Sequence, residues 1–106
     1  MKIIIKFHPF THKGIKHADT MVRTSNEEDS ITEVKLYNTL IVKFSRKGVI
    51  LNASNHLTTL TKRRMNQVSQ GYGLGFSIVQ EKFKWYVWFN AEKIPFKNYM
   101  MLHFGG

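Results

Sequence analysis

The stretch between residues 52 and 89 constrains the fold of this chain most, because it contains a complete set of signals for one helix. Threonines that can cap exposed backbone amides stand before a run in which apolar side chains recur at helical spacing. Glycines, which helices favour just past their last turn, follow that run. The pattern predicts a helix that begins at Thr58, Thr59 or Thr61, ends at Gly71 or Gly73, and buries Leu60 or Thr61, Met65, Val68 and Tyr72.

Two β-hairpins are predicted to flank this helix. Residues 36–44 alternate between two faces, and a turn at residues 45–48 returns the chain as a strand at residues 49–52, with Gly48 able to adopt a positive φ. Residues 76–80 and 83–89 form the second hairpin. Alternation in its second strand favours core positions for Phe83, Trp85, Val87 and Phe89, and the opposite face for Lys84, Tyr86 and Trp88.

The remaining segments carry weaker signals. Residues 2–7 are predicted as a strand that Pro9 ends, and residues 99–104 as a last short strand after a break at residues 94–96. Residues 8–33 are polar without sustained periodicity and are predicted to form a long loop or arm. The expected fold is an α+β domain, with a largely antiparallel sheet packed by a single α-helix in the order β-ββ-α-ββ-β.

Length and composition restrict the class of protein. A chain of 106 residues forms a single domain, here an arm at residues 8–33 and a basic core at residues 34–106. The absence of cysteine excludes disulfides, thiol catalysis and thiolate metal sites, and it fits a reducing compartment. The longest apolar run, residues 85–89, is far shorter than the roughly 20 residues of a membrane span. We therefore expect a cytoplasmic protein with no membrane partner, and the sequence leaves its oligomeric state open.

The net charge of +9 is concentrated after residue 33. Residues 1–33 hold five basic and five acidic side chains, whereas residues 34–106 hold eleven basic side chains against only Glu81 and Glu92. Such a field attracts polyanions and raises their association rates. A high pI that serves only solubility is the alternative explanation.

The basic start of the helix is the strongest candidate for a binding site. Hydroxyls, free amides and cations there can contact one phosphate-bearing strand, and side-chain amides one turn further can reach base edges. Cations of the first hairpin would extend the patch, and the outward aromatic pair resembles a stacking platform for single-stranded nucleic acid, although it would equally suit a protein interface. The candidate residues are Thr59, Thr61, Lys62, Arg63, Arg64, Asn66, Gln67, Lys43, Arg46, Lys47, Lys84, Tyr86 and Trp88. A solvated helix face is the alternative.

The sequence contains few features that would indicate an enzyme. His8 and His12 have the spacing of helical metal ligands, but Pro9 and Gly14 oppose a helix there, so neither a metal nor a cofactor is expected. Carboxylates are too sparse after residue 33 for a paired-carboxylate site. The one enzymatic hypothesis kept is a small metal-independent ribonuclease that uses His56 beside the basic run.

Several short motifs resemble a group of small tailed-bacteriophage proteins. The motifs are a helix of the form T-x-T-K-x-R-[ML]-N, found here at residues 59–66, and a strand of the form Q-x(4)-W-Y-[VL], found here at residues 80–87. Similar short stretches lie at residues 36–42, 50–52 and 72–74. The resemblance implies phage origin and expression in the cytoplasm of an infected bacterium. It also favours a non-enzymatic binding role, because small phage proteins commonly redirect host machinery or counter host defences.

Two hypotheses follow from these observations. The first is a small basic phage protein that binds DNA or RNA through the basic helix and the nearby hairpin, without enzymatic activity. The alternative is a protein–protein inhibitor or adaptor that targets an acidic surface of host machinery or of a host defence system.

Overall fold

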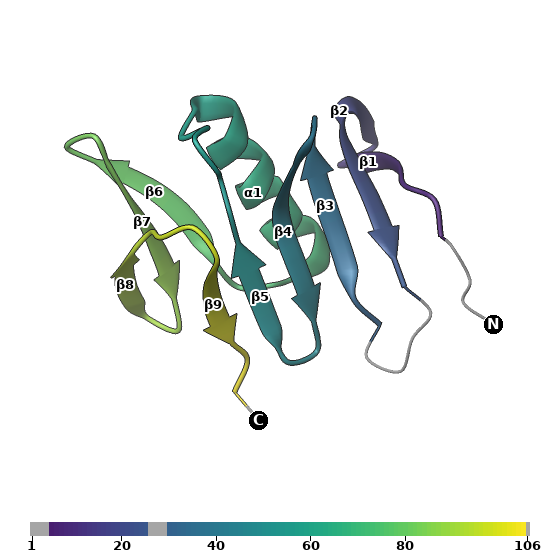
Figure 1. The fold of residues 1–106 in the computed structure, drawn as a ribbon. Helices are drawn as coiled ribbons and strands as arrows, with labels where there is room; N and C mark the ends of the chain where they lie inside the picture. Colours follow the sequence, from purple (N-terminus) through teal and green to yellow (C-terminus); the bar gives the residue numbers. More distant parts are fainter. Residues whose placement is uncertain (1–4, 26–29, 106) are drawn as a thin grey trace.

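The computed structural model describes residues 5–25 and 30–105, which form nine strands and one helix (Figure 1). The predicted class, one helix packed on a largely antiparallel sheet, is confirmed. The strand order differs from the prediction, because five strands instead of three precede the helix and one additional strand follows the second hairpin. The elements are β1 His8–His12, β2 Ile15–Thr24, β3 Thr32–Leu36, β4 Thr39–Ser45, β5 Gly48–Leu51, α1 Thr59–Tyr72, β6 Ser77–Glu81, β7 Lys84–Phe89, β8 Glu92–Pro95 and β9 Met100–His103.

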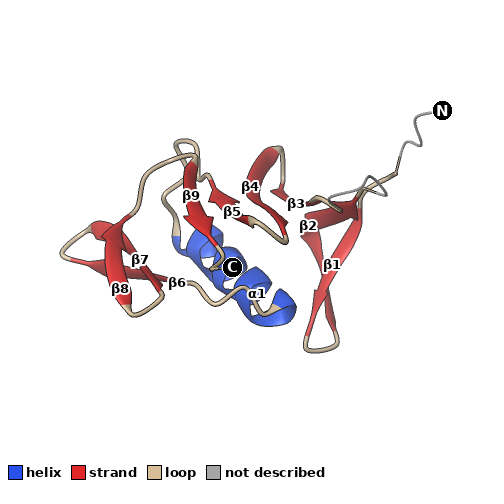
Figure 2. Ribbon diagram, turned by 90° about the horizontal axis from the view of Figure 1, so that it is seen from below, coloured by secondary structure: helices blue, strands red, loops and turns tan. Residues whose placement is uncertain are grey.

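Two antiparallel sheets share one core. The larger sheet has the order β1-β2-β3-β4-β5-β9 and the smaller one β6-β7-β8. Helix α1 lies along one face of the larger sheet, and the smaller sheet sits next to the helix on the β9 side (Figure 2). A single cluster of buried side chains joins all three parts, and it includes Val34, Val42, Met65, Val87 and Leu102.

The N-terminal region forms a β-hairpin, so the predicted arm at residues 8–33 is wrong. Strands β1 and β2 pair across a turn at Lys13 and Gly14, whose φ values are 50° and 78°. Only Thr20 and Val22 of the ten residues of β2 are fully buried, which is why the sequence shows no clear alternation. Pro9 lies within β1, at the edge of the sheet, where a missing N–H is tolerated. The predicted strand at residues 2–7 falls partly outside the described residues, and residues 5–7 have no regular structure.

Residues 36–44 form the end of one strand and most of the next. Tyr37 and Asn38 make the turn between β3 and β4. Residue 41 is then an extra residue in β4, because Val34 pairs with Val42 while its neighbour Lys35 pairs with Leu40. This bulge lets Ile41 and Val42 both face the core and leaves Leu40 and Lys43 exposed, so the strict alternation predicted for this segment is wrong.

The predicted turn after β4 is confirmed, but its glycine has another role. Gly48 begins β5 and does not have a positive φ. Strand β9 instead passes so close that a Cβ atom at residue 48 would collide with the backbone carbonyl oxygen of Leu102. Glycine is required here because it allows the two strands to approach.

Helix α1 agrees with the predicted bounds. The hydroxyl of Thr58 accepts a hydrogen bond from the amide of Thr61 at 3.2 Å, and Gly73 ends the helix in the left-handed conformation, with φ 65°. Met65 and Val68 are fully buried, as predicted, whereas Tyr72 is partly exposed. Arg64 and Ser69 are buried as well, which the apolar pattern did not predict.

The second hairpin is confirmed, with a different turn. Lys82 and Phe83 connect β6 to β7 with φ values of 48° and 68°, so Phe83 belongs to the turn rather than to β7. Its side chain is 95% exposed, and its predicted place in the core is wrong. Residues 94 and 95, predicted as part of a break, lie in β8, and the last predicted strand is present as β9.

Candidate nucleic-acid interface

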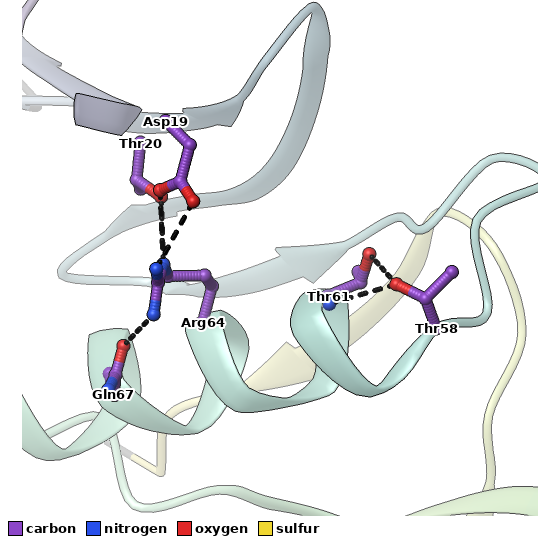
Figure 3. A network of polar contacts seen from close by, with 6 residues as sticks. All are labelled: Asp19, Thr20, Thr58, Thr61, Arg64 and Gln67. Atoms are coloured by element: carbon purple, nitrogen blue, oxygen red, sulfur yellow. Dashed lines mark hydrogen bonds and ion pairs between the residues drawn. The ribbon is translucent and has the colours of Figure 1, made fainter. Parts of the chain in front are cut away.

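Arg64 does not reach solvent as a phosphate contact would. Its guanidinium lies between α1 and β2, where Nε and Nη2 each donate to the carboxylate of Asp19 at 3.2 Å (Figure 3). Nε also lies 3.2 Å from the hydroxyl of Thr20, and Nη1 donates to Oε1 of Gln67 at 3.0 Å. The side chain is 8% exposed. The prediction that Arg64 contacts phosphate is therefore wrong, because the residue is buried and its bonds to Asp19 and Thr20 join the helix to the sheet.

The same contacts change the acidity of Asp19. Partial burial acts to raise the pKa of this carboxyl group, but hydrogen bonds from Arg64 and Thr20 and the charges of Arg64 and His17 outweigh burial. The pKa of Asp19 is consequently lower than its ordinary value. Asp19 is thus a charged partner of Arg64 near neutral pH, and it neutralises one cation of the predicted basic run.

Two more of the predicted contacts hold the fold together. Thr61 is buried and uses its amide and its hydroxyl to bond the capping residue Thr58 (Figure 3). Asn66 bonds the backbone of Ile78 in β6, with Oδ1 accepting from the N–H group at 2.7 Å and Nδ2 donating to the carbonyl at 3.0 Å. Thr61 and Asn66 are therefore not available to a phosphate or a base edge, contrary to the prediction.

Part of the predicted basic run does face solvent. Thr59 and Arg63 are exposed, and Lys62 is half-buried with Nζ 3.3 Å from Oε1 of Gln80. The oxygen of Gln67 is held by Arg64, so its NH2 group is the end left to donate to a ligand. Arg63, Asn66 and Gln67 are the predicted residues that line a common cleft, and of these Asn66 is held by the backbone of Ile78.

The cations of the β4–β5 hairpin lie elsewhere. Lys43 points away from the helix, on the uncovered face of the larger sheet, where it pairs in register with Glu33 and Ile50. Arg46 lies in a hollow with Tyr72 and Gly73 at the C-terminal end of α1, and Lys47 is exposed in the adjacent turn. The prediction that these residues extend the patch at the start of the helix is wrong.

The outward aromatic pair lies on the predicted face of β7. Trp88 is 43% exposed and Tyr86 is half-buried, opposite the buried face of Trp85. Lys93 covers the ring of Tyr86 at 4.8 Å from its centroid and forms an ion pair with Glu81 at 2.7 Å. This hydrogen bond with Glu81 raises the pKa of Lys93. Lys84 is exposed on the same face of β7 as Tyr86 and Trp88, so this surface carries both positive and negative charges. Trp88 is the more accessible ring of the aromatic pair.

A cationic concave surface lies between α1 and the β1–β2 hairpin, and we call it the hairpin–helix cleft. Its volume is about 390 Å³. Among residues 5–25 and 30–105 no carboxylate lines it, and its side chains are donors, cations and imidazoles, with one aliphatic residue: His12, Lys13, Ile15, His17, Arg63, Asn66, Gln67 and Gln70.

The walls of the cleft are firmly placed. The rings of His12 and His17 each stack at 6.1 Å from the ring of buried Phe10. Nδ1 of His12 lies beside Gly71 in the last turn of α1, at 3.6 Å from where a Cβ atom would be. Phe10 therefore supports both imidazoles, and His12 lies against the last turn of the helix.

Sequence reasoning missed this cleft because it treated the hairpin as a loop. The available signal was Gly14 between two short stretches with histidines, since a glycine at a two-residue turn is typical of hairpins. The equal numbers of acidic and basic residues at positions 1–33 also concealed it, because that count does not show which acids are already paired. Asp19 forms an ion pair with Arg64, and Glu33 forms one with Arg23 at 2.8 Å. The hairpin thus presents Lys13, His12 and His17 without an opposing acid among the cleft residues.

Other site types are not indicated by the described part of the chain. Residues 5–25 and 30–105 contain no cluster of three His, Cys, Asp or Glu side chains that could hold a metal ion. They also contain no helix long and apolar enough to cross a membrane. His56, the ribonuclease candidate, lines a separate pocket with Thr58 and Leu60 rather than the cleft that contains Arg63.

Comparisons with known proteins place the chain in a phage family. The family described as Kyanoviridae Gp96 protein matches residues 10–103. This range includes both walls of the hairpin–helix cleft and all nine strands except the first two residues of β1. No curated protein and no solved structure matches the chain.

Proposed function

The chain belongs to the Kyanoviridae Gp96 protein family of bacteriophages, and we propose that it binds nucleic acid through the hairpin–helix cleft. The observation that carries this proposal is the composition of the cleft: two exposed cations, two imidazoles and two glutamines, with no carboxylate from the part of the chain that the structure describes. Such a set donates hydrogen bonds and positive charge but repels cations, which is the chemistry that phosphodiesters require.

Each wall of the cleft supplies one exposed cation. Lys13 projects from the tight turn of the β1–β2 hairpin, and Arg63 from the exposed side of α1. Arginine offers a planar fork for a phosphate, and lysine offers a point charge. A nucleic-acid backbone that passes between the walls would meet both, while Gln67 and Gln70 donate from the floor and rim.

The surrounding charge supports the same proposal. The chain has a net charge of +9, so long-range attraction would raise the local concentration of any polyanion around the cleft. The carboxylate of Asp19, which interacts electrostatically with His17, is neutralised by Arg64. The field at the cleft is therefore positive even though the N-terminal third of the sequence is balanced in charge.

The proposal is tested by the salt dependence of binding. Fluorescence anisotropy with labelled single-stranded RNA, single-stranded DNA and duplex DNA should detect binding at 50 mM salt. Roughly two to four phosphate contacts to a single strand would make log K fall with log salt at a slope of about −1.4 to −2.8. Absence of binding to all three probes at low salt, or affinity that does not respond to salt, would refute the proposal.

A further inference from the structure

We propose that the end of the molecule at the start of α1 docks an acidic protein segment that inserts an apolar side chain. Here the β3–β4 turn and the start of the helix lie at one end of the fold, the upper end in Figure 1, and the start of β9 lies beside the end of β5. A pocket of about 360 Å³ opens there, with Leu36, Ile41, Ala53 and Leu60 in its wall. We call this surface, with the exposed residues around it, the apolar docking end. It is separate from the hairpin–helix cleft.

Three large side chains are exposed at this end without contributing to the core. Tyr37 lines the pocket and is 66% exposed, while Leu57 and Tyr99 are 57% and 74% exposed. Leu57 immediately precedes the capping residue of the helix. Asn98, next to Tyr99, bonds the amide of Ala53 and the carbonyl of Ser54, which brings the start of β9 against the pocket wall. Exposed tyrosines beside an apolar pocket are typical anchors of protein interfaces.

Both tyrosines adopt a backbone conformation that bulky residues rarely occupy. Their φ values are 52° for Tyr37 and 64° for Tyr99. Glycine or asparagine would fit such positions with less strain, so neither tyrosine is there for the stability of the turn. Their amides are nevertheless fixed, since Tyr37 donates to the carbonyl of Asp19 at 2.8 Å and Tyr99 to that of Leu51 at 2.7 Å. The rings are consequently presented on rigid backbone, which lowers the entropic cost of binding.

The charge of the residues at this end indicates which kind of partner would bind there. In the segments that form it, residues 36–41, 53–62 and 97–99, the ionisable side chains other than tyrosine are His56, Lys62 and Lys97. Asp19, whose carbonyl accepts from the amide of Tyr37, carries a carboxylate that is paired with Arg64. An acidic segment is therefore complementary to the rim. The aliphatic wall suits an apolar side chain better than a nucleobase, which would need a stacking partner and edge hydrogen bonds inside the pocket.

The test selects binders from a random peptide library and measures the affinity of the selected peptides. Nuclease-treated protein is the bait. The Tyr37→Ser, Tyr99→Ser double variant is used for counter-selection, so that peptides that bind to other surfaces of the protein are discarded. We expect convergence on an apolar residue flanked by Asp or Glu, and at least about ten-fold weaker binding of the selected peptide to Leu57→Ala and to Lys97→Glu. Trp88→Ala, which changes an exposed ring on the smaller sheet, is the matched control and should bind normally.

Several outcomes would overturn the proposal. In the peptide experiment they are failure of the selected sequences to converge, convergence on basic or uncharged peptides, and equal binding of the selected peptide to all variants. Oligonucleotide binding that is lost in the Tyr37→Ser, Tyr99→Ser variant would also overturn it. Self-association of the wild type, abolished by those two substitutions in sedimentation, would assign the surface to a second copy instead. All substituted side chains are exposed, so thermal unfolding should show intact folds. The result is independent of nucleic-acid binding at the cleft, which these variants leave unchanged.

Discussion

The carboxamide of Asn66 bonds both backbone groups of Ile78, at 2.7 Å to the N–H group and 3.0 Å to the carbonyl. One turn further along α1, the hydroxyl of Ser69 does the same for Phe76, at 3.1 Å and 2.6 Å. These side chains satisfy the outer edge of β6, where a neighbouring strand would otherwise pair. The helix thereby serves as the partner of β6 and joins the smaller sheet to the rest of the fold.

Replacement of Asn66 by alanine should therefore destabilise the protein without touching the cleft cations. Two backbone groups lose their partners, and each unsatisfied group costs about 1–3 kcal/mol, so we expect a loss of about 2–6 kcal/mol in the free energy of unfolding. Urea unfolding measures this quantity. Gln70→Ala, at an exposed position one turn away, is the control and should change it by less than about 0.5 kcal/mol. Equal effects for the two variants would contradict this role of Asn66.

The ion pair between Asp19 and Arg64 should make stability depend on acid pH. The pKa of Asp19 is lower in the folded protein than in the unfolded chain, where it is about 3.9, so its contribution is complete above that value and lost as pH falls below it. We expect Asp19→Asn to reduce the free energy of unfolding at pH 7 and to reduce it less at pH 2–3. Urea unfolding at both pH values checks the sign, and a cost that is the same at both would refute it.

A methyl group at residue 48 should disturb the approach of β5 and β9. The Cβ atom of Gly48→Ala would collide with the carbonyl of Leu102, and such overpacking typically costs about 1–3 kcal/mol. Gly105→Ala is a matched control, because a Cβ atom there meets nothing within 4 Å and Gly105 has no positive φ. Thermal unfolding should therefore separate the two variants by several degrees. Similar melting temperatures would show that the strands can move apart at little cost.

The Lys82-Phe83 turn should be open to stabilisation. Both residues have a positive φ, and Asn-Gly is the pair that such a two-residue hairpin turn favours. The double substitution Lys82→Asn, Phe83→Gly should raise the free energy of unfolding by about 0.5–1 kcal/mol, measured by urea unfolding. Phe83→Ala alone removes only an exposed ring and should be nearly neutral. A loss of stability in the double variant would show that Phe83 packs in solution.

Sequence reasoning succeeded where local signals and packing agreed. Thr58 and Gly73 bound the helix as predicted because capping is decided within a few residues. Trp85 and Val87 are buried as predicted because alternation and burial coincide in β7. Prediction failed where long-range contacts decide the role of a residue. Nothing near Arg64 in the sequence shows that Asp19, 45 residues earlier, is its partner.

The helix motif on which the resemblance to phage proteins rests illustrates the same limit. In T-x-T-K-x-R-[ML]-N, the second threonine bonds the capping residue, the arginine joins α1 to β2, the methionine is core, and the asparagine bonds β6. Polar residues that appear suited to nucleic acid thus have structural roles. The exposed chemistry lies at Arg63, a variable position of that motif, and on a hairpin that the sequence did not reveal.

The central claim is that nucleic acid binds at the hairpin–helix cleft. It is tested most directly by reversing charges in the cleft and, as a control, at cations that the sequence predicted to bind but that lie outside it. The variant Lys13→Glu, Arg63→Glu and the control Lys43→Glu, Lys84→Glu change the net charge equally, at exposed residues of different surfaces. In anisotropy titrations of labelled single-stranded RNA and DNA at 50 mM salt, the cleft variant should lose at least about ten-fold in affinity, with a salt slope reduced by about 1.4 for two lost phosphate contacts. The control should retain most of its affinity and its slope. Equal losses in the two variants, or a greater loss in the control, would contradict binding at the hairpin–helix cleft.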